Sequence, residues 1–508
     1  MFSYVETAFK SCGFFIFLKN TCEYKKNTKG DLKAVEKIKK FFKIEERGSS
    51  IGIELLGGLV TFLAMVYILP VNAGMLSITG MSFAGVFAAT AIAAAFATIL
   101  MGFLGKVPIA LASGMGVNAF FTYTVAGTLG FSWQEALAAV LISGILFLIV
   151  SLTGLRQIII NAIPKSLKLA IGAGIGFFIA FIGLKNAGII IADPATFVRL
   201  GDFSHPTVLL GLFGVLLVLA LFAMNNKISK YAIIISIAGT GILGALIGLI
   251  FPSLANAMPA FGGTNGGSIT DIGGLFGKAF SAIPSLLSNP LAYAVIFTFL
   301  FIDFFDTAGT LVAVGHEAGL LDENGQLKGS NKALLVDAVG TVAGAILGTS
   351  TVTSYIESTT GIKSGARTGL ASIFTGVLFL IALLFFPLFS IVNGIFSGNY
   401  DVYGDPIFYS PVTAMALVFV GILMVRPVKD IDWNDPIVSA SSFITIIVMI
   451  LSFSISEGIA FGFISYALMM AVSKRRKEVS PVVYILGALF VINLIIYYNG
   501  LYSYPFWP

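Results

Sequence analysis

The sequence predicts an all-α polytopic membrane protein, and three observations support this fold class. Of the 508 residues, 57% are hydrophobic and only 11% are charged, whereas soluble domains carry about 25% charged residues. The mean hydropathy is +0.96, and apolar stretches long enough to cross a bilayer recur between residues 51 and 473. The 56 glycines fit helices that pack closely in lipid. This composition excludes an ordinary globular enzyme.

Residues 1–50 are predicted to be a cytoplasmic N-terminal segment, because the first long apolar span begins only near Ile51. The stretch 33–47 is dense in charge. The run 12–18 (CGFFIFL) is too short to span a bilayer and lacks a convincing signal-peptide cleavage site. Two interpretations stay open: the run is an interfacial anchor, or translation starts later and residues 1–33 are an upstream extension.

Apolar runs predict fourteen segments in two sets of seven. The first set is 51–73, 83–104, 110–125, 134–153, 163–187, 206–224 and 231–251. A polar, glycine-rich stretch, 252–289, is predicted to be an extracytoplasmic loop. The second set is 290–314, 332–348, 352–363, 366–390, 409–425, 437–454 and 457–473. A basic loop and an accessory apolar helix at 482–499 fill residues 474–508, and the aromatic end of the chain suits a membrane interface.

Basic residues give the predicted orientation. With the N-terminus in the cytoplasm, each inside loop contains Lys or Arg, from Lys106 to the run 474–477 (KRRK). The outside loops contain none, apart from Arg199 and Lys278 in the two long ones. The bias predicts a multi-pass protein of the plasma membrane, with both ends of the fourteen-segment unit inside.

The order of features in the two sets predicts a 7+7 inverted repeat, with halves at 51–251 and 290–473. The third segment of each half is short and rich in Gly, Ser and Thr. The fifth segment of each half opens on a proline, Pro164 and Pro411. An odd number of segments per half would give the halves opposite orientations.

The eighth segment contains two carboxylates, Asp303 and Asp306, in residues 301–307 (FIDFFDT). Their spacing of three places both on one face of a helix. A carboxylate at membrane depth costs several kcal/mol unless it faces protein or water, so such residues usually mark an ion or substrate path. Another acid, Glu357, lies in a second apolar segment. These acids predict a transporter with H⁺ as its coupling ion, because burial and neighbouring acids both favour protonated carboxyls.

The two short segments are predicted to be interrupted helices that form the substrate site. In the first, Gly114 and Gly116 permit an extended or left-handed backbone. Asn118 then offers both a donor and an acceptor, and Phe120 and Phe121 follow as candidate stacking rings. In the second, Glu357 is expected near the start of a half-helix. An amide, acids and aromatic rings suit a small planar heterocycle with hydrogen-bonding edges.

Structural roles for the same residues stay open from sequence alone. Asp303 and Asp306 could cap a half-helix or bond buried backbone, and Asn118 could join helices. Phe120 and Phe121 could be packing residues. Four other charged residues are interpreted as structural or interfacial: Glu54, Asp337, Arg367 and Glu457.

The sequence gives little support for other classes of ligand or for an enzyme. The net charge of +5 is spread over short loops, so no nucleic-acid partner is predicted. Two cysteines (Cys12, Cys22) and two histidines (His205, His316) give no basis for a disulfide framework or a metal site, and no cofactor is expected. No nucleophile–base pair indicates an integral membrane enzyme. An anion carrier, a channel and a non-transporting receptor are the remaining alternatives.

Three motifs in this order closely resemble the AzgA-like purine permeases of the nucleobase:cation symporter-2 (nucleobase–ascorbate) family. They are 114–125 (GMGVNAFFTYTV), 301–311 (FIDFFDTAGTL) and 348–361 (GTSTVTSYIESTTG), the last followed by 367–372 (RTGLAS). The resemblance covers about residues 41–490.

The resemblance implies the fold of the uracil permease. A core domain would hold segments 1–4 and 8–11, and a gate domain would hold segments 5–7 and 12–14. Segments 3 and 10 would each contribute a short strand that pairs across the site. Dimerisation through the gate domain is what related folds suggest.

The resemblance also implies proton-coupled uptake of a purine nucleobase. Guanine and hypoxanthine are favoured, and adenine is the alternative. The predicted substrate-binding residues are Asn118, Phe120, Asp303, Tyr355 and Glu357. Proton coupling is assigned to Asp303, Asp306 and Glu357, with Asp306 tuning or supporting Asp303.

Overall fold

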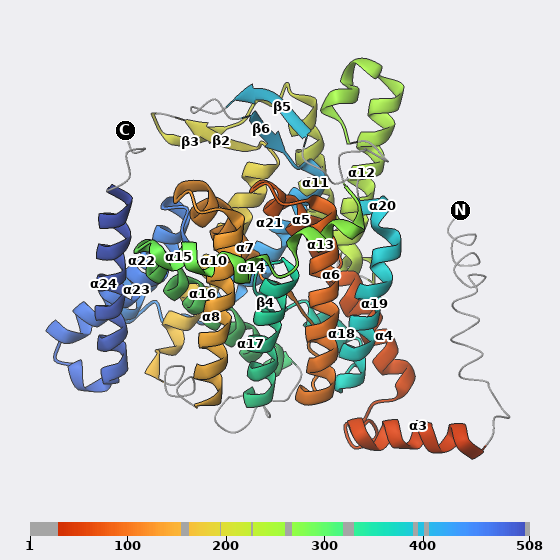
Figure 1. The fold of residues 1–508 in the computed structure, drawn as a ribbon, viewed down its shortest axis with the longest axis horizontal. Helices are drawn as coiled ribbons and strands as arrows, with labels where there is room; N and C mark the ends of the chain where they lie inside the picture. The colour runs from red at the N-terminus through yellow and green to blue at the C-terminus, as the bar shows by residue number, and fades with distance from the viewer. Residues whose placement is uncertain are drawn as a thin grey trace.

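The computed structural model describes residues 29–153, 162–193, 195–224, 227–259, 267–317, 330–389, 395–400 and 406–502. Within these ranges, nine helices are long and apolar enough to cross a membrane. They form an upright bundle, and α3 (Lys29–Phe42) lies across one end of it (Figure 1). The prediction of a mostly helical polytopic membrane protein is confirmed, while the count of fourteen segments and the inverted repeat stay predictions.

Most predicted segments coincide with helices to within a few residues. The first half contains α4 (Ile51–Met65), α5 (Ile68–Ser77), α6 (Phe83–Leu100), α8 (Trp133–Leu152), α10 (Lys165–Asn186), α11 (Pro206–Ala223) and α12 (Ala232–Ile250). The second half contains α16 (Leu291–Glu317), α17 (Ser330–Leu347), α19 (Gly369–Ala382), α21 (Pro411–Val425), α22 (Pro436–Leu451) and α23 (Ile455–Val472). The accessory apolar helix is α24 (Pro481–Tyr502).

Polar residues fix several of these helix starts. The Ser82 hydroxyl accepts from the Gly85 N–H at the start of α6. Ser132 and Glu135 form a capping box at the start of α8. Side-chain acceptors at this position pair with backbone N–H groups that have no partner within the helix.

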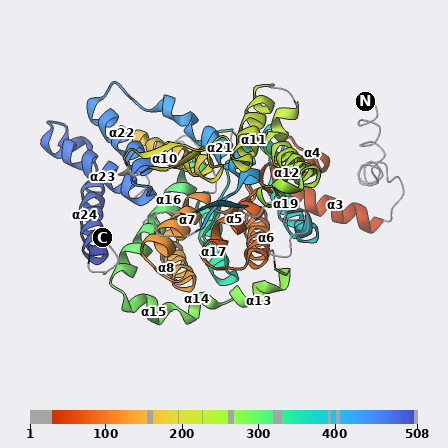
Figure 2. The ribbon, with the colours of Figure 1, turned by 90° about the horizontal axis from the view of Figure 1, so that it is seen from above.

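Packing divides the helices into two groups that lie side by side (Figure 2). The first group consists of α4, α5, α6, α8, α16, α17 and α19, and the second consists of α10, α11, α12, α21, α22 and α23. Small residues allow close approach within each group. In the second group, for example, a Cβ at Gly176 of α10 would lie 3.0 Å from the carbonyl oxygen of Gly421 in α21. The groups meet where α10 packs on α16.

The two short polar segments are interrupted, as predicted. The first holds β1 (Leu111–Ser113), α7 (Met115–Ala119) and the π-helix η2 (Phe120–Thr128). The second holds β4 (Val352–Ser354) and α18 (Ser358–Lys363). β1 and β4 pair antiparallel, with Ser113 opposite Val352 and Leu111 opposite Ser354. The expected pair of short strands is therefore confirmed.

The glycines at the two breaks adopt different backbone conformations. Gly114 is extended, with φ −73° and ψ 114°, and a Cβ there would lie 3.1 Å from Thr353 of β4. Gly348, ahead of the second break, has φ 96°, which favours glycine. Gly116, which permits an extended or left-handed backbone as Gly114 does, lies instead inside α7.

Residues 252–289, expected to be a loop, contain several short helices. These are η4 (Pro252–Ala257), η6 (Ile269–Asp271), α13 (Ile272–Leu275), α14 (Lys278–Ser281) and α15 (Ile283–Ser288). α13 packs on α6, and α14 and α15 pack on α8. Buried Leu275, Ala279 and Leu286 provide the apolar contacts. The sequence did not predict these helices because Gly and Ser residues separate the apolar residues that are buried.

The remaining elements lie at the two ends of the bundle. The hairpins β2 (Ile190–Asp193) with β3 (Phe197–Leu200) and β5 (Ile395–Tyr400) with β6 (Pro406–Tyr409) lie at the end opposite α3 (Figure 1). The other short helices are η1 (Met101–Gly105), η3 (Lys227–Tyr231), η7 (Leu383–Phe385), α20 (Phe386–Phe389), η9 (Arg426–Asp430) and η10 (Arg476–Glu478). The run 12–18 and the aromatic residues Tyr504, Phe506 and Trp507 lie outside the described ranges.

Candidate substrate site

Asn118 lies at the junction of the two broken segments. It is fully buried in α7. Its Oδ1 accepts from the hydroxyls of Ser113, at 3.0 Å, and Ser350. Its Nδ2 has no hydrogen-bond partner among the described residues. A buried donor without an acceptor is unfavourable in a protein interior, so this amide is a candidate ligand contact.

Asp303 and Asp306, both on α16, have different partners. Asp303 is 1% exposed, and its Oδ2 accepts from the Thr341 hydroxyl of α17 at 2.8 Å. Asp306 is less buried, and its Oδ2 lies 3.5 Å from the Thr353 hydroxyl of β4. Asp306 therefore faces the broken segment, whereas Asp303 is held against α17.

Glu357 immediately precedes α18 and is 3% exposed. Its Oε1 accepts from the Tyr67 hydroxyl at 2.6 Å. Tyr67 lies between α4 and α5 and was not among the predicted site residues. The sequence could have marked Tyr67 as a site residue, because it is the single tyrosine in the apolar span 51–73 and a buried phenol hydroxyl usually needs a partner.

Tyr355 joins the two broken segments. Its N–H donates to the Ala110 carbonyl at 3.0 Å, and its hydroxyl donates to the Ser113 carbonyl. The paired strands thus bring the predicted amide and tyrosine close to Thr353, which contacts Asp306, and to Glu357, which follows β4.

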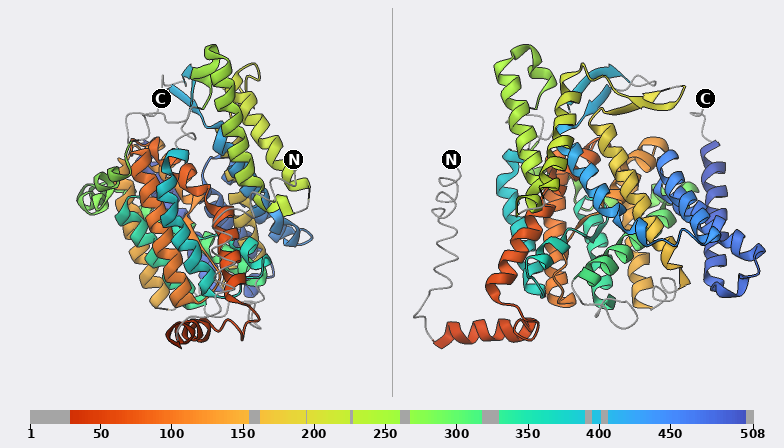
Figure 3. Two further views of the ribbon diagram at one scale, coloured as in Figure 1. Left: turned by 90° about the vertical axis from the view of Figure 1, so that its right-hand side faces the viewer. Right: turned by 180° about the vertical axis from the view of Figure 1, so that it is seen from behind.

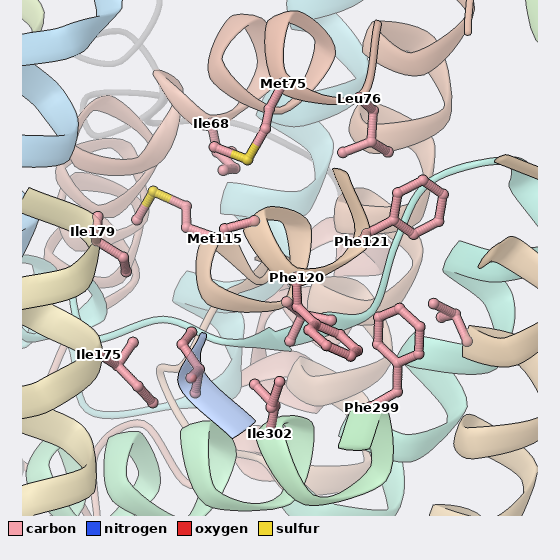
Figure 4. Packing of buried hydrophobic residues seen from close by; sticks show 14 of the residues in the cluster. Ile68, Met75, Leu76, Met115, Phe120, Phe121, Ile175, Ile179, Phe299 and Ile302 are labelled. Carbon is pink, nitrogen blue, oxygen red and sulfur yellow. The ribbon is translucent and has the colours of Figure 1, made fainter. Parts of the chain in front are cut away.

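Phe120 packs against α16. Its ring meets Phe299 edge to face, with centroids 4.9 Å apart, and the side chain is 3% exposed. In Figure 4 it lies close to Phe299 and Ile302, with Phe121 on the far side of the same turn. This arrangement favours the packing interpretation in the observed state, and stacking on a ligand stays a prediction.

Two polar residues outside the predicted set hold the second break in place. Asp337 of α17 accepts from the Thr307 hydroxyl at 2.5 Å and from both the N–H and hydroxyl of Ser354 at 2.9 Å. Asn72 of α5 donates to the hydroxyls of Thr90 and Thr349, at 2.7 and 2.8 Å. These bonds tie the second break to the surrounding helices, so they support a structural role for each residue.

Glu54 and Arg367 form a cap at the α3 end of the bundle. The Glu54 carboxylate accepts from the N–H groups of Arg367, at 2.9 Å, and Thr368, at 3.1 Å. It therefore caps α19, and not its own helix as its position suggested. The Arg367 guanidinium donates to the Ile362 carbonyl of α18 at 2.7 Å. Both residues are structural.

The chain matches the Permease family (Xan_ur_permease) over residues 52–461. It belongs to this family. It is 44% identical over 467 residues to the Guanine/hypoxanthine permease PbuG of Bacillus subtilis (strain 168), covering 90% of this chain and 99% of the relative. It is 38% identical over 459 residues to the Adenine permease AdeQ of Escherichia coli (strain K12), covering 90% and 96%. The resemblance drawn from the three motifs is confirmed, and the family consists of transporters, not enzymes.

The fold resembles a solved transporter structure of low sequence identity. The transmembrane domain of a cyanobacterium bicarbonate transporter, BicA, superimposes with a TM-score of 0.54 at 15% identity, covering 81% of this chain and 96% of that domain. This likeness supports the membrane-transporter fold alone.

Proposed function

We propose that this permease is a proton-coupled symporter that imports a purine nucleobase, with guanine and hypoxanthine favoured over adenine. The observation that carries the proposal is the buried Asn118 Nδ2, which has no partner among the described residues. Asn118 lies in the broken segment whose strand β1 pairs with β4, and β4 is contacted by Asp306 and followed by Glu357. The names of the relatives support the purine class. The 44% identity to a guanine/hypoxanthine permease, against 38% to an adenine permease, favours the 6-oxopurines.

The polar groups match the edges of a purine. The Asn118 N–H donates to a ring nitrogen or to the oxygen at position 6, and Glu357 or Asp303 accepts from ring N–H groups. Adenine differs from guanine and hypoxanthine in the hydrogen-bonding pattern at positions 1 and 6. Tyr355 sets the spacing between the two breaks, and Phe120 turns to stack on the bound ring.

Proton coupling is assigned to the same carboxyls. Asp303 or Glu357 takes up a proton from outside before the purine binds, and Asp306 tunes this step. The proton and the purine leave together toward the cytoplasm. The end of the bundle with α3 is assigned to the cytoplasm because the predicted inside loops, including Lys106 and Arg367, carry the basic residues.

Alternating access follows from the division into two groups. The first group serves as the core, because it contains both broken segments and α16. The second serves as the gate. The purine site moves past the gate where α10 packs on α16 and α7.

The test is uptake of labelled hypoxanthine by cells that lack their own purine carriers, with and without a protonophore. We expect protonophore-sensitive uptake that guanine competes and uracil does not. Competition by adenine alone would support the proposed mechanism but make adenine the preferred substrate. Absence of purine uptake by protein shown to reach the membrane would overturn the proposal, and uptake of labelled sulfate by the same protein would then point to an anion carrier.

A further inference from the structure

α3 presents a partly exposed apolar stripe to the outside of the molecule. Val35, Ile38 and Phe41 recur at intervals of three residues, so they lie along one side of the helix. They are 40%, 41% and 46% exposed. Figure 3 shows α3 lying across the ends of the spanning helices, away from the body of the bundle. The stripe therefore runs along the level at which α4 begins and α6 ends.

The stripe continues the lipid-facing surface of α6 and η1. The rings of Phe41 and Phe103 are 6.3 Å apart, and Phe103 is 47% exposed. Phe96, seven residues earlier and on the same side, is 45% exposed. α6 and η1 form one of the candidate spans, Phe83–Gly105. The lipid that covers Phe96 and Phe103 consequently reaches α3.

Lysines lie at the edge of the stripe and on the polar face of α3. Lys37 lies one helical turn before Phe41, at the edge of the stripe, and Lys40 lies one turn after Glu36 on the polar face. Lys106 places its Nζ 4.0 Å from the centroid of the Phe41 ring. Lysines at the edge of an apolar helix face can extend their ammonium groups to anionic headgroups while the stems lie on apolar surface.

α3 is also tied to the end of the core. The Arg47 guanidinium, just after α3, donates to the carbonyls of Lys106, at 2.7 Å, and Arg367, at 3.0 Å. Lys106 precedes β1, and Arg367 follows α18. α3 is thereby linked to both broken segments at one point.

We propose that α3 is an interfacial helix that binds anionic phospholipid of the cytoplasmic leaflet. Its apolar stripe enters the boundary between acyl chains and headgroups, Lys37 contacts the phosphates at the edge of the stripe, and Lys40 adds positive charge near the membrane surface. Through Arg47, this lipid contact holds the core at a defined depth. The leaflet and the effect on transport rest on the proposed function, but the lipid contact itself does not.

The test places an environment-sensitive probe on Ile38→Cys in the full-length protein, with Cys12 and Cys22 replaced by serine. The matched control is Glu36→Cys, on the opposite side of α3. Both are measured in nanodiscs of phosphatidylcholine with or without phosphatidylglycerol. We expect a lipid-borne quencher to quench the Ile38 probe and aqueous iodide to quench the Glu36 probe. Lipid quenching at position 38 should increase with phosphatidylglycerol.

A charge variant tests the anionic preference. Lys37→Gln with Lys40→Gln should weaken the response to phosphatidylglycerol by about fivefold per lysine. Equal lipid quenching at positions 36 and 38 would overturn the proposal. Protection of position 38 from both quenchers would also overturn it, because a second copy or another segment of the chain would then cover the stripe. Equal quenching with and without phosphatidylglycerol would overturn the anionic preference.

Transport by the same protein separates this proposal from the proposed function. Hypoxanthine uptake by proteoliposomes should rise with phosphatidylglycerol and lose that rise in the double lysine variant. Failure of uptake in every lipid would count against the substrate or the coupling, while the probe measurement would still decide the lipid contact.

Discussion

Single side chains in the site are held mainly by hydroxyl groups from other segments. Tyr67 donates to Glu357, and Thr341 donates to Asp303. A hydroxyl can donate to a carboxylate and can accept from a carboxylic acid, so these partners remain useful when the acid changes its protonation. Such partners are compatible with the proton transfer proposed for Glu357 and Asp303.

Removing the Tyr67 hydroxyl should impair transport with little effect on folding. Tyr67→Phe keeps the buried ring and deletes one hydrogen bond to a carboxyl, worth about 1.5–3 kcal/mol. We expect uptake at limiting substrate to fall roughly tenfold or more. Tyr293→Phe, on a tyrosine 60% exposed on α16, is the control. Equal uptake by the two variants would contradict a role for Tyr67 in positioning Glu357.

The two buried asparagines should respond oppositely to the same change. Asn118→Asp removes an N–H that has no partner among the described residues, so we expect the melting temperature to stay near that of the wild type and hypoxanthine affinity to fall roughly tenfold or more. Asn72→Asp removes bonds to Thr90 and Thr349 and should lower the melting temperature. Binding and thermal unfolding of the purified proteins measure both. Unchanged affinity in Asn118→Asp would remove the main support for the proposed function.

At the level of elements, hydropathy predicted where helices lie because each span is long and apolar on most sides. It did not predict the helices at 252–289, whose buried residues are few and separated by glycine and serine. Asn118, Asp303, Asp306 and Glu357 stood out because polar groups are rare in such spans. Tyr67 did not, because its importance depends on a partner 290 positions away in sequence. Long-range contacts of this kind cannot be read from local patterns.

Two glycines of α10 should differ in their tolerance of a methyl group. A Cβ at Gly176 would lie 2.7 Å from the Met424 Cβ and 3.0 Å from the Gly421 carbonyl, whereas a Cβ at Gly172 would meet nothing within 4 Å. Gly176→Ala should destabilise the protein by about 1–3 kcal/mol, because α10 and α21 must separate. Gly172→Ala should leave the melting temperature unchanged or slightly raised. Similar behaviour of both variants in thermal unfolding would contradict the close packing of α10 on α21.

The Asp435 carboxylate at the start of α22 should make the free energy of unfolding depend on pH. Arg475 and the backbone N–H groups of Val438 and Ile437 hold the pKa of Asp435 below its usual range. Since the unfolded value is about 3.9, this stabilisation is present above that pH and is lost as the pH falls through the lower, folded pKa. Asp435→Asn should therefore melt below the wild type at pH 6, and the difference should vanish in acid. Asp430→Asn is the control, and a difference independent of pH would contradict the assignment.

For the whole molecule, side chains of both groups close the bundle at the end opposite α3. The Phe453 ring, in the turn between α22 and α23, lies 5.5 Å from the Tyr123 ring of η2. Lys185, at the end of α10, lies 4.6 Å from the Tyr123 ring and 5.0 Å from the Phe453 ring. Phe178 and Phe181 of α10 also meet Phe453. The aromatic and cation–π contacts fit a state in which the two groups are shut at this end, which is the outer end in the proposed orientation.

Opening this closure should expose the site to the outside. Phe453→Ala removes the contacts with Tyr123, Phe178 and Phe181, each worth about 0.5–1.5 kcal/mol. A membrane-impermeant thiol reagent, added outside, reports the opening through Met115→Cys in a protein without Cys12 and Cys22. We expect Phe453→Ala to raise the labelling rate roughly tenfold or more, because a shift of 1.4 kcal/mol is a tenfold change in population.

The matched control for that labelling is Phe443→Ala, on a phenylalanine 57% exposed on α22. It removes a ring of the same size from α22, the helix before the turn that contains Phe453, but leaves the contact between the two groups intact. Equal labelling in the two variants would show that Phe453 is not part of the closure. Faster labelling in Phe453→Ala alone, suppressed by hypoxanthine, would tie the closure to the substrate site and to movement between the two groups.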